Sequence, residues 1–503
     1  MTARRTFLGI DCGTQGTKAL LVGEDGEVLG RGYARHALVE RANGAREQDP
    51  AWWITALQDA VKQALAGHDS TAIQGIGVSG QQHGLVVLDE RKQVIRPAKL
   101  WNDTETAPQN EELVRRLGGR GAFFERFGIV PLTGYTVSKL LWLRQQEPEN
   151  FARIRHILLP HEYLNYWLTG EMRAECGDAS GTAYFDVRSR AWLREVLEAI
   201  DGGTGQLLAA LPPLIDADEI VGTVRAEVAM QFGLSTQCIV SAGGGDNMMG
   251  AIGTGNVRPG VVTLSLGTSS TVYSYQPEPL LDAAGAVAPF CSSSGGWLPL
   301  VCTMNATHVV TSTLQLVGRT VDDIDGALAA TSPGANGLVF LPFLNGERTP
   351  DLPAARGSLH GIAPENFTLQ HLVRAAVEGV TFGILHGLDL ILRGRPAEAV
   401  QLIGGGARSR GWRQMIADAT GAVIHVPAEE ESGCLGAAIQ AMLAVSVKTA
   451  SPATFESLTA EVVRLRDDLT VRPNASLRTA YAHARAAYRR QLRISYPSVA
   501  SSL

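Results

Sequence analysis

Residues 6–22 read TFLGIDCGTQGTKALLV, a turn of glycine, hydroxyl and amide residues between two apolar runs. This pattern predicts a β-hairpin with strands over 6–10 and 19–22. The backbone N–H groups and hydroxyls of such a turn can surround phosphate oxygens, and the cation Lys18 lies beside it. Asp11 ends the first apolar run and can hold a hydrated Mg²⁺. A plain hairpin with a solvated lysine is the alternative interpretation.

The same pattern occurs a second time, far along the chain. Residues 261–273, VVTLSLGTSSTVY, again place a Gly-Thr pair and further hydroxyls between two apolar runs. Repetition at this separation predicts two similar domains whose phosphate-binding hairpins face one nucleotide. Coincidence is the alternative, because Gly-Thr pairs are common. The chain has no Walker sequence, and Gly253-Thr254-Gly255 lacks the third glycine of a dinucleotide-binding fingerprint.

Size and composition are those of a two-domain globular enzyme. The chain has 503 residues with a net charge of −6, too many for one core and too acidic for a nucleic-acid surface. Six cysteines without Cys-x-x-Cys spacing indicate free thiols in a reducing compartment. No uninterrupted apolar run reaches the ~18 residues of a membrane helix, and no signal-peptide pattern precedes the first strand. We therefore expect a cytoplasmic protein that binds neither nucleic acid nor membrane.

One carboxylate follows a run of glycines. Residues 238–240 predict a buried strand, three glycines follow it, and Asp246 and Asn247 precede a predicted helix that starts at 248. α/β enzymes place their chemistry at the carboxyl edge of a sheet, so Asp246 is a candidate catalytic residue. An ordinary pKa of about 3.9 would leave it ionised at neutral pH. A simple helix N-cap is the equally good alternative.

Polar residues after other predicted strands fit a sugar. A strand over 73–80 ends in Gln81-Gln82-His83-Gly84, and Trp101-Asn102-Asp103 follows a further apolar run. Imidazole, amide and carboxyl groups exchange hydrogen bonds with adjacent hydroxyls of a polyol. A histidine satisfied by backbone groups and an Asn-Asp turn are the alternatives.

The second half of the chain contains a glycine-rich turn and several predicted helices. A strand over 400–403 leads into Gly404-Gly405-Gly406, whose bare backbone lets an adenosine lie against it. The turn-rich segment 343–350 is a candidate to reach the cleft. Helices are predicted over 368–392, from 432 and over 477–492, the last as a surface helix.

These segments, in this order, resemble the FGGY carbohydrate kinases over almost the whole chain. Residues 134–146 are similar to the first signature of that family, with Thr136, Lys139 and Trp142 in place, and 357–378 are similar to the second. The resemblance implies an α/β fold of two actin-like, ribonuclease H-type domains with a cleft between them. Residues 1–255 would form the sugar-binding domain and residues 256–503 the nucleotide-binding domain.

The resemblance also implies a role for individual residues. Asp246 would be the general base, and Asp11 a second catalytic residue that holds Mg²⁺. The sugar contacts would be Gln82, His83, Trp101, Asp103, Asp246 and Asn247. The ATP contacts would be Gly13, Thr14, Lys18, Gly267, Thr268, Gly405 and Gly406. Gln82 departs from the family pattern, since Met is usual there in bacterial members that act on a ketopentose, so the exact sugar stays open.

The implied reaction is transfer of the ATP γ-phosphoryl group to a ketopentose. A kinase of the same family for ribulose, fuculose, gluconate or glycerol is one alternative. An actin-like ATPase without a small acceptor is another, but it has no reason to carry Gln82-His83 and Asp246-Asn247. A homodimer is a further expectation, although the sequence does not determine the oligomeric state.

Overall fold

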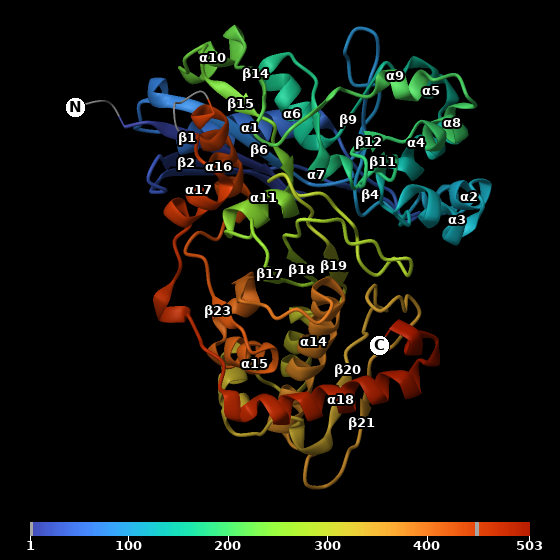
Figure 1. Ribbon diagram of the computed structural model, residues 1–503, viewed down its shortest axis with the longest axis vertical. Coiled ribbons are helices and arrows are strands. Elements are labelled where there is room, and N and C mark those ends of the chain that lie inside the picture. The colour runs from blue at the N-terminus through green and yellow to red at the C-terminus, as the bar shows by residue number, and fades with distance from the viewer. Residues whose placement is uncertain (1–3, 448–451, 503) are drawn as a thin grey trace.

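The computed structural model describes residues 4–447 and 452–502, which form two parts, each built around one β-sheet (Figure 1). In the first part the strand order of the sheet is β14-β15-β6-β1-β2-β3, and the short strand β16 also pairs with β6. β1 pairs antiparallel with β2 and parallel with β6. The strands are β1 (Thr6–Cys12), β2 (Gly16–Gly23), β3 (Val28–Arg35), β6 (Ile73–Gly80), β14 (Ile220–Thr223), β15 (Ile239–Ser241) and β16 (Gly244–Gly245).

The second part repeats this arrangement in the sheet β19-β18-β17-β22-β23. β17 pairs antiparallel with β18 and parallel with β22, as β1 does with β2 and β6. The strands are β17 (Val261–Leu266), β18 (Ser270–Ser274), β19 (Leu300–Thr303), β22 (Ala399–Ile403) and β23 (Val423–His425). Both Gly-Thr segments therefore form the turn of the first hairpin of a sheet. The predicted α/β fold of two similar actin-like domains is confirmed.

Helices cover both faces of the first sheet. Leu8 and Ile10 of β1 point to one face and pack in a cluster with α1 (Pro50–Ala64). Phe7 points to the other face and packs in a cluster with α16 (Ser432–Ser446). This alternation is the period of two that a strand buried on both faces requires.

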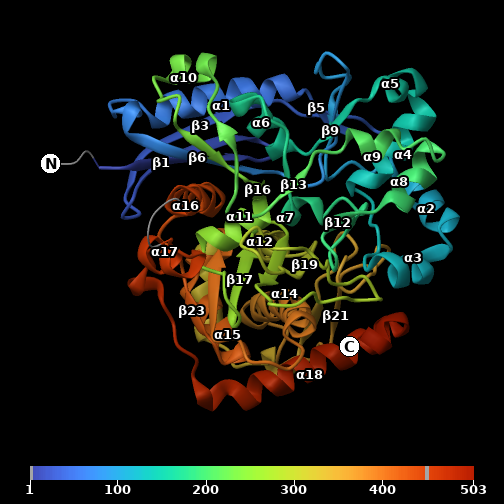
Figure 2. The ribbon, with the colours of Figure 1, turned by 45° about the horizontal axis from the view of Figure 1, so that its top comes forward.

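The helix α16 belongs by sequence to the second predicted domain but packs against the first part. The boundary near residue 255 falls between α11 (Asp246–Gly253) and β17. The later helices α16 and α17 (Phe455–Val462) nevertheless pack with residues of β1, β2 and α11. Figure 2 shows α16 beside β1, with α11 next to it. The first part is therefore completed by residues from the end of the chain.

A helical layer extends the first part on the side away from α16 (Figure 1). Its apolar core is a separate cluster that includes Phe123, Leu140 and Leu197. The helices are α2 (Ala107–Arg116), α3 (Gly119–Phe127), α4 (Thr136–Gln146), α5 (Pro148–Arg153), α8 (Arg194–Asp201) and α9 (Gln206–Ala210). The helix α6 (Pro160–Thr169) packs instead with α1 in the cluster of the first sheet. The predicted helical segment that ends near Gly170 corresponds to α6, and Gly170 caps it in the left-handed conformation.

The second part is centred on α14 (Leu369–Leu392), with α18 (Arg478–Ser495) along its outer side (Figure 1). Among the described residues, α14 is the one helix with the length and apolar composition to cross a membrane. It is also the core helix of the second part, because 83% of its most apolar window is buried. The predicted helices at these two places are confirmed. All six cysteines are free, as expected.

The backbones of α11 and α16 touch at glycines, which gives a first prediction. A Cβ atom at Gly436 would overlap the carbonyl oxygen of Met249. We expect Gly436→Ala to destabilise the protein by about 1–3 kcal/mol, since overpacking between two backbones cannot relax by side-chain rotation. Calorimetry should show a thermal midpoint lower by about 5 °C.

Gly326→Ala is the matched control, because Gly326 also lies in a helix, α13 (Ile324–Ala329), and a Cβ there meets nothing within 4 Å. Its midpoint should stay constant or rise slightly, as expected when alanine replaces glycine in a helix. Equal midpoints for both variants would contradict the proposed role of close backbone packing.

Candidate active site

Asp246 lies at the carboxyl end of the first sheet. The short strand β16 pairs in parallel with Ser79 and Gly80, the last residues of β6, and α11 begins at Asp246 immediately afterwards. The predicted order of strand, glycine turn and helix is therefore confirmed. It brings Asp246 beside the segment that follows β6, which contains Gln82 and His83.

One oxygen of the Asp246 carboxylate is held and the other is free. Oδ1 accepts hydrogen bonds from the backbone N–H of Asn247, at 2.8 Å, and from its Nδ2, at 3.0 Å. Within the described ranges no protein group donates to Oδ2. Asp246 is not the N-cap residue, because that position belongs to Gly245. Asn247 thus fixes the carboxylate and leaves one oxygen for a ligand.

The Asp246 carboxyl does not have the ordinary pKa expected from the sequence. Burial raises its pKa to about 7, and the negative charges of Asp11 and Asp178 add to this effect. The hydrogen bonds from Asn247 act in the opposite direction but are weaker. The expectation of a fully ionised carboxylate at neutral pH is therefore wrong for the free protein. A base whose pKa lies near neutrality is better matched to proton transfer than an ordinary carboxylate.

A cavity of about 280 Å³ opens in front of Asp246 and is lined by both parts of the chain. The first part contributes Gln82, His83, Trp101, Leu132, Tyr135, Asp246 and Asn247. The second part contributes Ser269, Thr271, Phe290, Leu300, Cys302, Arg348 and three residues of the 285–288 segment. Aromatic faces beside a few polar groups are typical of a small-molecule site. Five of the six predicted sugar contacts line this cavity.

Gln82 connects the cavity to the residue that holds the Asp246 carboxylate. Its side chain is 5% exposed, and its Oε1 accepts a hydrogen bond from Nδ2 of Asn247 at 3.1 Å. Its Nε2 is buried without a hydrogen-bond partner. A buried donor without a partner costs about 1–3 kcal/mol, which an oxygen of a ligand can offset. The Gln82 amide therefore offers a specific donor to a ligand.

His83 presents a neutral imidazole to the cavity. Burial lowers its pKa to about 3, and the positive charges of Lys139 and Arg348 lower it further. Its ring packs against Tyr135, with ring centroids 4.7 Å apart, and near Phe290, at 5.8 Å. A neutral imidazole can both donate and accept a hydrogen bond, which suits hydroxyl groups.

Two of the predicted sugar contacts have other partners. Trp101 lines the cavity but donates its indole N–H to Oγ1 of Thr14 at 3.0 Å, so it links the cavity to the first hairpin. Asp103 does not line the cavity. It is fully buried, and its Oδ2 accepts from Nζ of Lys99 at 3.0 Å and from the backbone N–H of Arg46 at 2.9 Å. Contact of Asp103 with the sugar stays a prediction that this geometry does not support.

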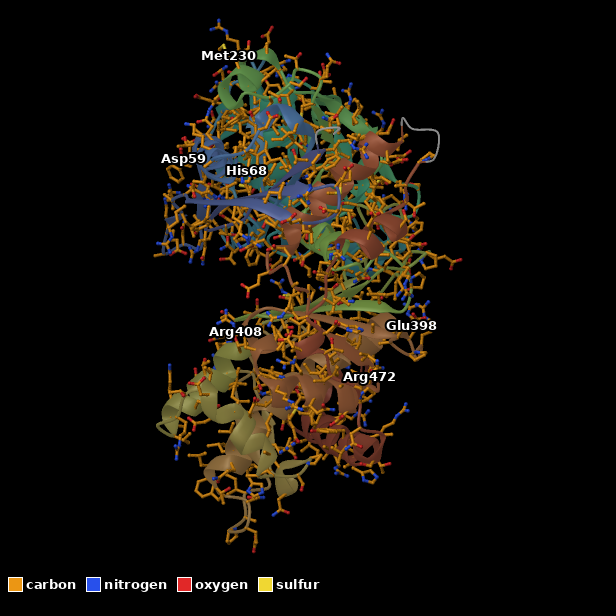
Figure 3. The ribbon with its side chains drawn as sticks, turned by 90° about the vertical axis from the view of Figure 1, so that its left-hand side faces the viewer. Asp59, His68, Met230, Glu398, Arg408 and Arg472 are labelled. Atoms are coloured by element: carbon orange, nitrogen blue, oxygen red, sulfur yellow. The ribbon has the colours of Figure 1, made fainter. Side chains whose placement is uncertain are left out.

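The first hairpin and the glycine turn of the second part meet at one cavity. Lys18 forms an ion pair with Glu431 at 2.5 Å, and both line a cavity of about 300 Å³ together with Gly404 and Gly405. Arg408 lines this cavity as well. In Figure 3 Arg408 lies at the end of the second part that faces the first part.

A second cavity, of about 520 Å³, adjoins it. Gly405 and Arg408 line both cavities, and Gly406 lines the larger one. The predicted adenosine contacts, Gly405 and Gly406, therefore lie at a site with room for a ligand.

The remaining predicted nucleotide contacts lie in the two hairpin turns. Gly13 donates its N–H to the carbonyl of Gly16, which closes the first turn. The carbonyls of Gly267 and Thr268 accept N–H groups from the start of α12 (Thr307–Leu316), which fixes the second turn. Ser269, the next residue, lines the cavity in front of Asp246. The second turn thus adjoins the cavity in front of Asp246.

Asp11 has the properties of a residue that binds a metal together with a ligand. Its Oδ1 accepts a hydrogen bond from the Ser79 hydroxyl at 2.6 Å, and burial raises its pKa. In residues 4–447 and 452–502 no group of three or more His, Cys, Asp or Glu side chains could hold a metal ion by itself. Mg²⁺ characteristically binds through one or two carboxylates plus phosphates and water. Asp11 therefore fits a Mg²⁺ ion that arrives with a nucleotide.

The cavity lining includes residues that the sequence did not identify as contacts. Tyr135, Phe290, Ser269 and Thr271 are among them. Ser269 and Thr271 lie in the second hairpin, which the sequence did predict, but no pattern paired them with Gln82. Arg348 belongs to the turn-rich segment 343–350, so the expectation that this segment reaches the cleft is confirmed.

The fold and the site together define a class of protein. Two actin-like domains share a cavity with a carboxylate and side chains that can hydrogen-bond hydroxyl groups, and they share a second cavity with a lysine and a glycine turn. This combination is that of a two-domain kinase that phosphorylates a small hydroxyl compound.

Comparison with known proteins agrees with this class. The N-terminal domain of the FGGY family of carbohydrate kinases matches residues 6–253, and its C-terminal domain matches residues 262–445. The chain belongs to the FGGY family of carbohydrate kinases.

Several relatives carry a more specific name. A xylulose kinase of Haemophilus influenzae is 49% identical over 446 residues, which are 87% of this chain and 90% of the relative. A xylulose kinase of Streptomyces rubiginosus is 41% identical over 86% of this chain and 87% of the relative. The crystal structure of a xyloylose kinase from Brucella ovis is 34% identical, with a TM-score of 0.88, over 99% of this chain and 100% of that one. A gluconate kinase from Lactobacillus acidophilus, with a TM-score of 0.89 at 21% identity, shares the fold.

Proposed function

We propose that this protein transfers the γ-phosphoryl group of ATP to the terminal hydroxyl of D-xylulose, forming D-xylulose 5-phosphate and ADP. The xylulose kinases among its relatives, at 33–49% identity, support this substrate. The observation that carries the proposal is the Asp246 carboxylate. It lines a cavity that also presents Gln82 and His83, and no described residue donates a hydrogen bond to its Oδ2.

Asp246 acts as the general base in this proposal. Its Oδ2 accepts the proton of the terminal hydroxyl while the hydroxyl oxygen attacks the γ-phosphorus in line with the leaving ADP oxygen. Asn247 holds Oδ1, so the carboxylate cannot rotate away from the hydroxyl. The free Nε2 of Gln82 and the neutral imidazole of His83 bind other oxygens of the sugar and fix the orientation of the sugar. Positioning of the reactants supplies much of the acceleration in such reactions.

The two hairpins and the glycine turn bind ATP in this proposal. The Gly13-Thr14 and Gly267-Thr268 turns surround the phosphates. The N–H groups of Gly13 and Gly267 close these turns on the carbonyls of Gly16 and Ser269, so those of Thr14 and Thr268 are the donors to phosphate oxygens. Lys18 offsets the phosphate charge, and Gly405 and Gly406 lie under the adenosine. Asp11 would hold Mg²⁺, which offsets phosphate charge when bound. Because both parts line the cavity in front of Asp246, their approach excludes water that would otherwise accept the phosphoryl group.

A coupled assay across a panel of acceptors tests the function. We expect the rate of ADP release to rise sharply with D-xylulose, and less or not at all with D-ribulose, L-xylulose, gluconate and glycerol. A preference for another acceptor would assign the protein to another sugar. Hydrolysis of ATP that no acceptor changes would instead favour an actin-like ATPase.

We also propose a cytoplasmic location, which the six free cysteines support because a reducing compartment keeps thiols unpaired. A homodimer stays a prediction that size-exclusion chromatography with light scattering can test.

The raised pKa of Asp246 predicts a pH-dependent rate. The base must be unprotonated to accept a proton, and its pKa in the free protein is about 7. We therefore expect kcat/KM for the sugar to fall about tenfold per pH unit below about 7 and to level off above it. A profile that stays flat down to pH 5 would contradict this role for a carboxyl with a raised pKa.

A further inference from the structure

The first family signature, residues 134–146, lies next to the proposed sugar cavity. Two of its residues, Thr136 and Lys139, do not line that cavity. Both residues belong to the first turn of α4 and are fully buried. Lys139 donates from Nζ to the carbonyl oxygens of His83, at 2.5 Å, and of Gly134, at 2.6 Å. Thr136 donates from Oγ1 to the same His83 carbonyl at 3.2 Å. Two signature residues therefore converge on one backbone oxygen.

The surroundings of Lys139 differ from those of an ordinary buried cation. Neighbouring Lys99 is ion-paired with Glu47, Asp103 and Glu105, at 3.3, 3.0 and 2.5 Å. Lys139 forms no ion pair within the described part of the chain, and its hydrogen-bond acceptors are uncharged carbonyls. Burial and the charge of Lys99 lower its pKa to about 7, against the opposing effect of Asp103. A buried ammonium group without a counter-charge is unfavourable. The hydrogen bonds of Lys139 therefore have a role that an apolar side chain could not fill.

The backbone that Lys139 holds is itself in an unusual conformation. His83 has φ = 64°, in the left-handed region that residues with a side chain rarely adopt. Such a conformation persists only when its surroundings hold it in place. The His83 carbonyl receives both hydrogen bonds, and the His83 ring lies against Tyr135 in the wall of the cavity. Fixing this carbonyl therefore fixes the direction in which the imidazole points.

We propose that Lys139 is a positioning residue for sugar binding, which holds the carbonyl of His83 and so presents the His83 imidazole to the acceptor. Thr136 assists through its second hydrogen bond to the same oxygen. This inference rests on the proposed function, because it assigns to His83 a contact with the sugar.

The test replaces Lys139 with methionine, which has a similar length and no donor. Steady-state kinetics of Lys139→Met should show KM for D-xylulose raised about tenfold, with KM for ATP within about twofold of the wild type. Arg374→Met is the matched control, since it likewise replaces a buried cation with methionine. Arg374 is 4% exposed and lies in the second part of the molecule. It should lower the thermal midpoint without changing the ratio of the two KM values. Equal increases of both KM values in Lys139→Met would mean a merely structural role and would overturn the proposal.

A double-mutant cycle makes the test specific to His83. If Lys139 acts through His83, Lys139→Met should have little further effect on the sugar KM in a His83→Ala background. Additive effects of the two substitutions would overturn the proposal. If Lys139→Met does not fold, Thr136→Val is the second variant, because it removes the other hydrogen bond to the His83 carbonyl. It should raise the sugar KM by a smaller factor. An unchanged sugar KM would overturn the proposal. A wild-type protein that phosphorylates no sugar would refute the proposed function itself.

Discussion

Asp246→Asn is expected to lower kcat by about 10²-fold or more, with KM for the sugar within about threefold of the wild type. The amide keeps an oxygen that can accept the hydrogen bonds from Asn247, so the site keeps its shape. It removes the basic oxygen that faces the cavity, so the acceptor hydroxyl has no group to take its proton. Initial rates of ADP release at saturating sugar and ATP measure the effect. Asp246→Ala should show a loss of at least the same size.

The exposed carboxylate of Asp218 provides the control for this substitution. Asp218→Asn makes the same chemical replacement at an exposed carboxylate of the first part and should leave kcat unchanged. The pH profile adds a second readout, because the acid limb near pH 7 should disappear in Asp246→Asn and persist in Asp218→Asn. Turnover in Asp246→Asn within tenfold of the wild type would remove Asp246 from the role of general base.

Local sequence pattern predicted the elements that place the site. The apolar run before Asp246 and the glycines after it form β15, β16 and the start of α11, as expected. The two hairpins could be predicted because each is built from neighbouring residues with strand and turn preferences. Their repetition was sufficient to predict two similar domains. The resemblance to a family then assigned roles to residues whose spacing alone left alternatives open.

The parts of the site that depend on distant segments could not be predicted in this way. No local pattern brings Phe290 against His83, or α16 onto the first sheet, because these contacts join residues far apart in the chain. The pKa of Asp246 depends on burial and on Asp11 and Asp178, which a single stretch of sequence does not contain. Asp103 is a different case. Its residue type suits a sugar, but the nearby Lys99 binds its carboxylate in the interior.

The signature residues illustrate a third case. The sequence identified Thr136 and Lys139 as typical of the family without giving them a task. In the structure, Thr136 and Lys139 donate to the backbone carbonyl of residue 83. Every residue type has such a carbonyl, so the residue type at position 83 does not reveal the interaction. Sequence similarity can therefore mark such a residue, whereas its function follows only from the hydrogen bonds that it makes.

Asp11→Asn is expected to lower kcat by about 10²-fold at a fixed Mg²⁺ concentration and to raise the Mg²⁺ concentration for half-maximal rate by about tenfold or more. The amide can still accept the hydrogen bond from Ser79, so the end of β1 should keep its conformation. The substitution removes a negative charge at the end of β1, beside the turn of the first hairpin. Because the nearby Glu431 is ion-paired with Lys18, its carboxylate is not free to replace that charge.

Titration of Mg²⁺ against the rate, at constant ATP, distinguishes a metal-binding role from a structural one. Asp25→Asn is a suitable control, since Asp25 is exposed in the turn between β2 and β3 of the same sheet and forms an ion pair with Arg4. Its Mg²⁺ curve should coincide with that of the wild type. A metal-binding role for Asp11 requires that high Mg²⁺ restore part of the lost rate in Asp11→Asn. If the rate falls but no Mg²⁺ concentration restores any of it, and KM for ATP rises instead, Asp11 acts on the nucleotide through the hairpin and not through a metal ion.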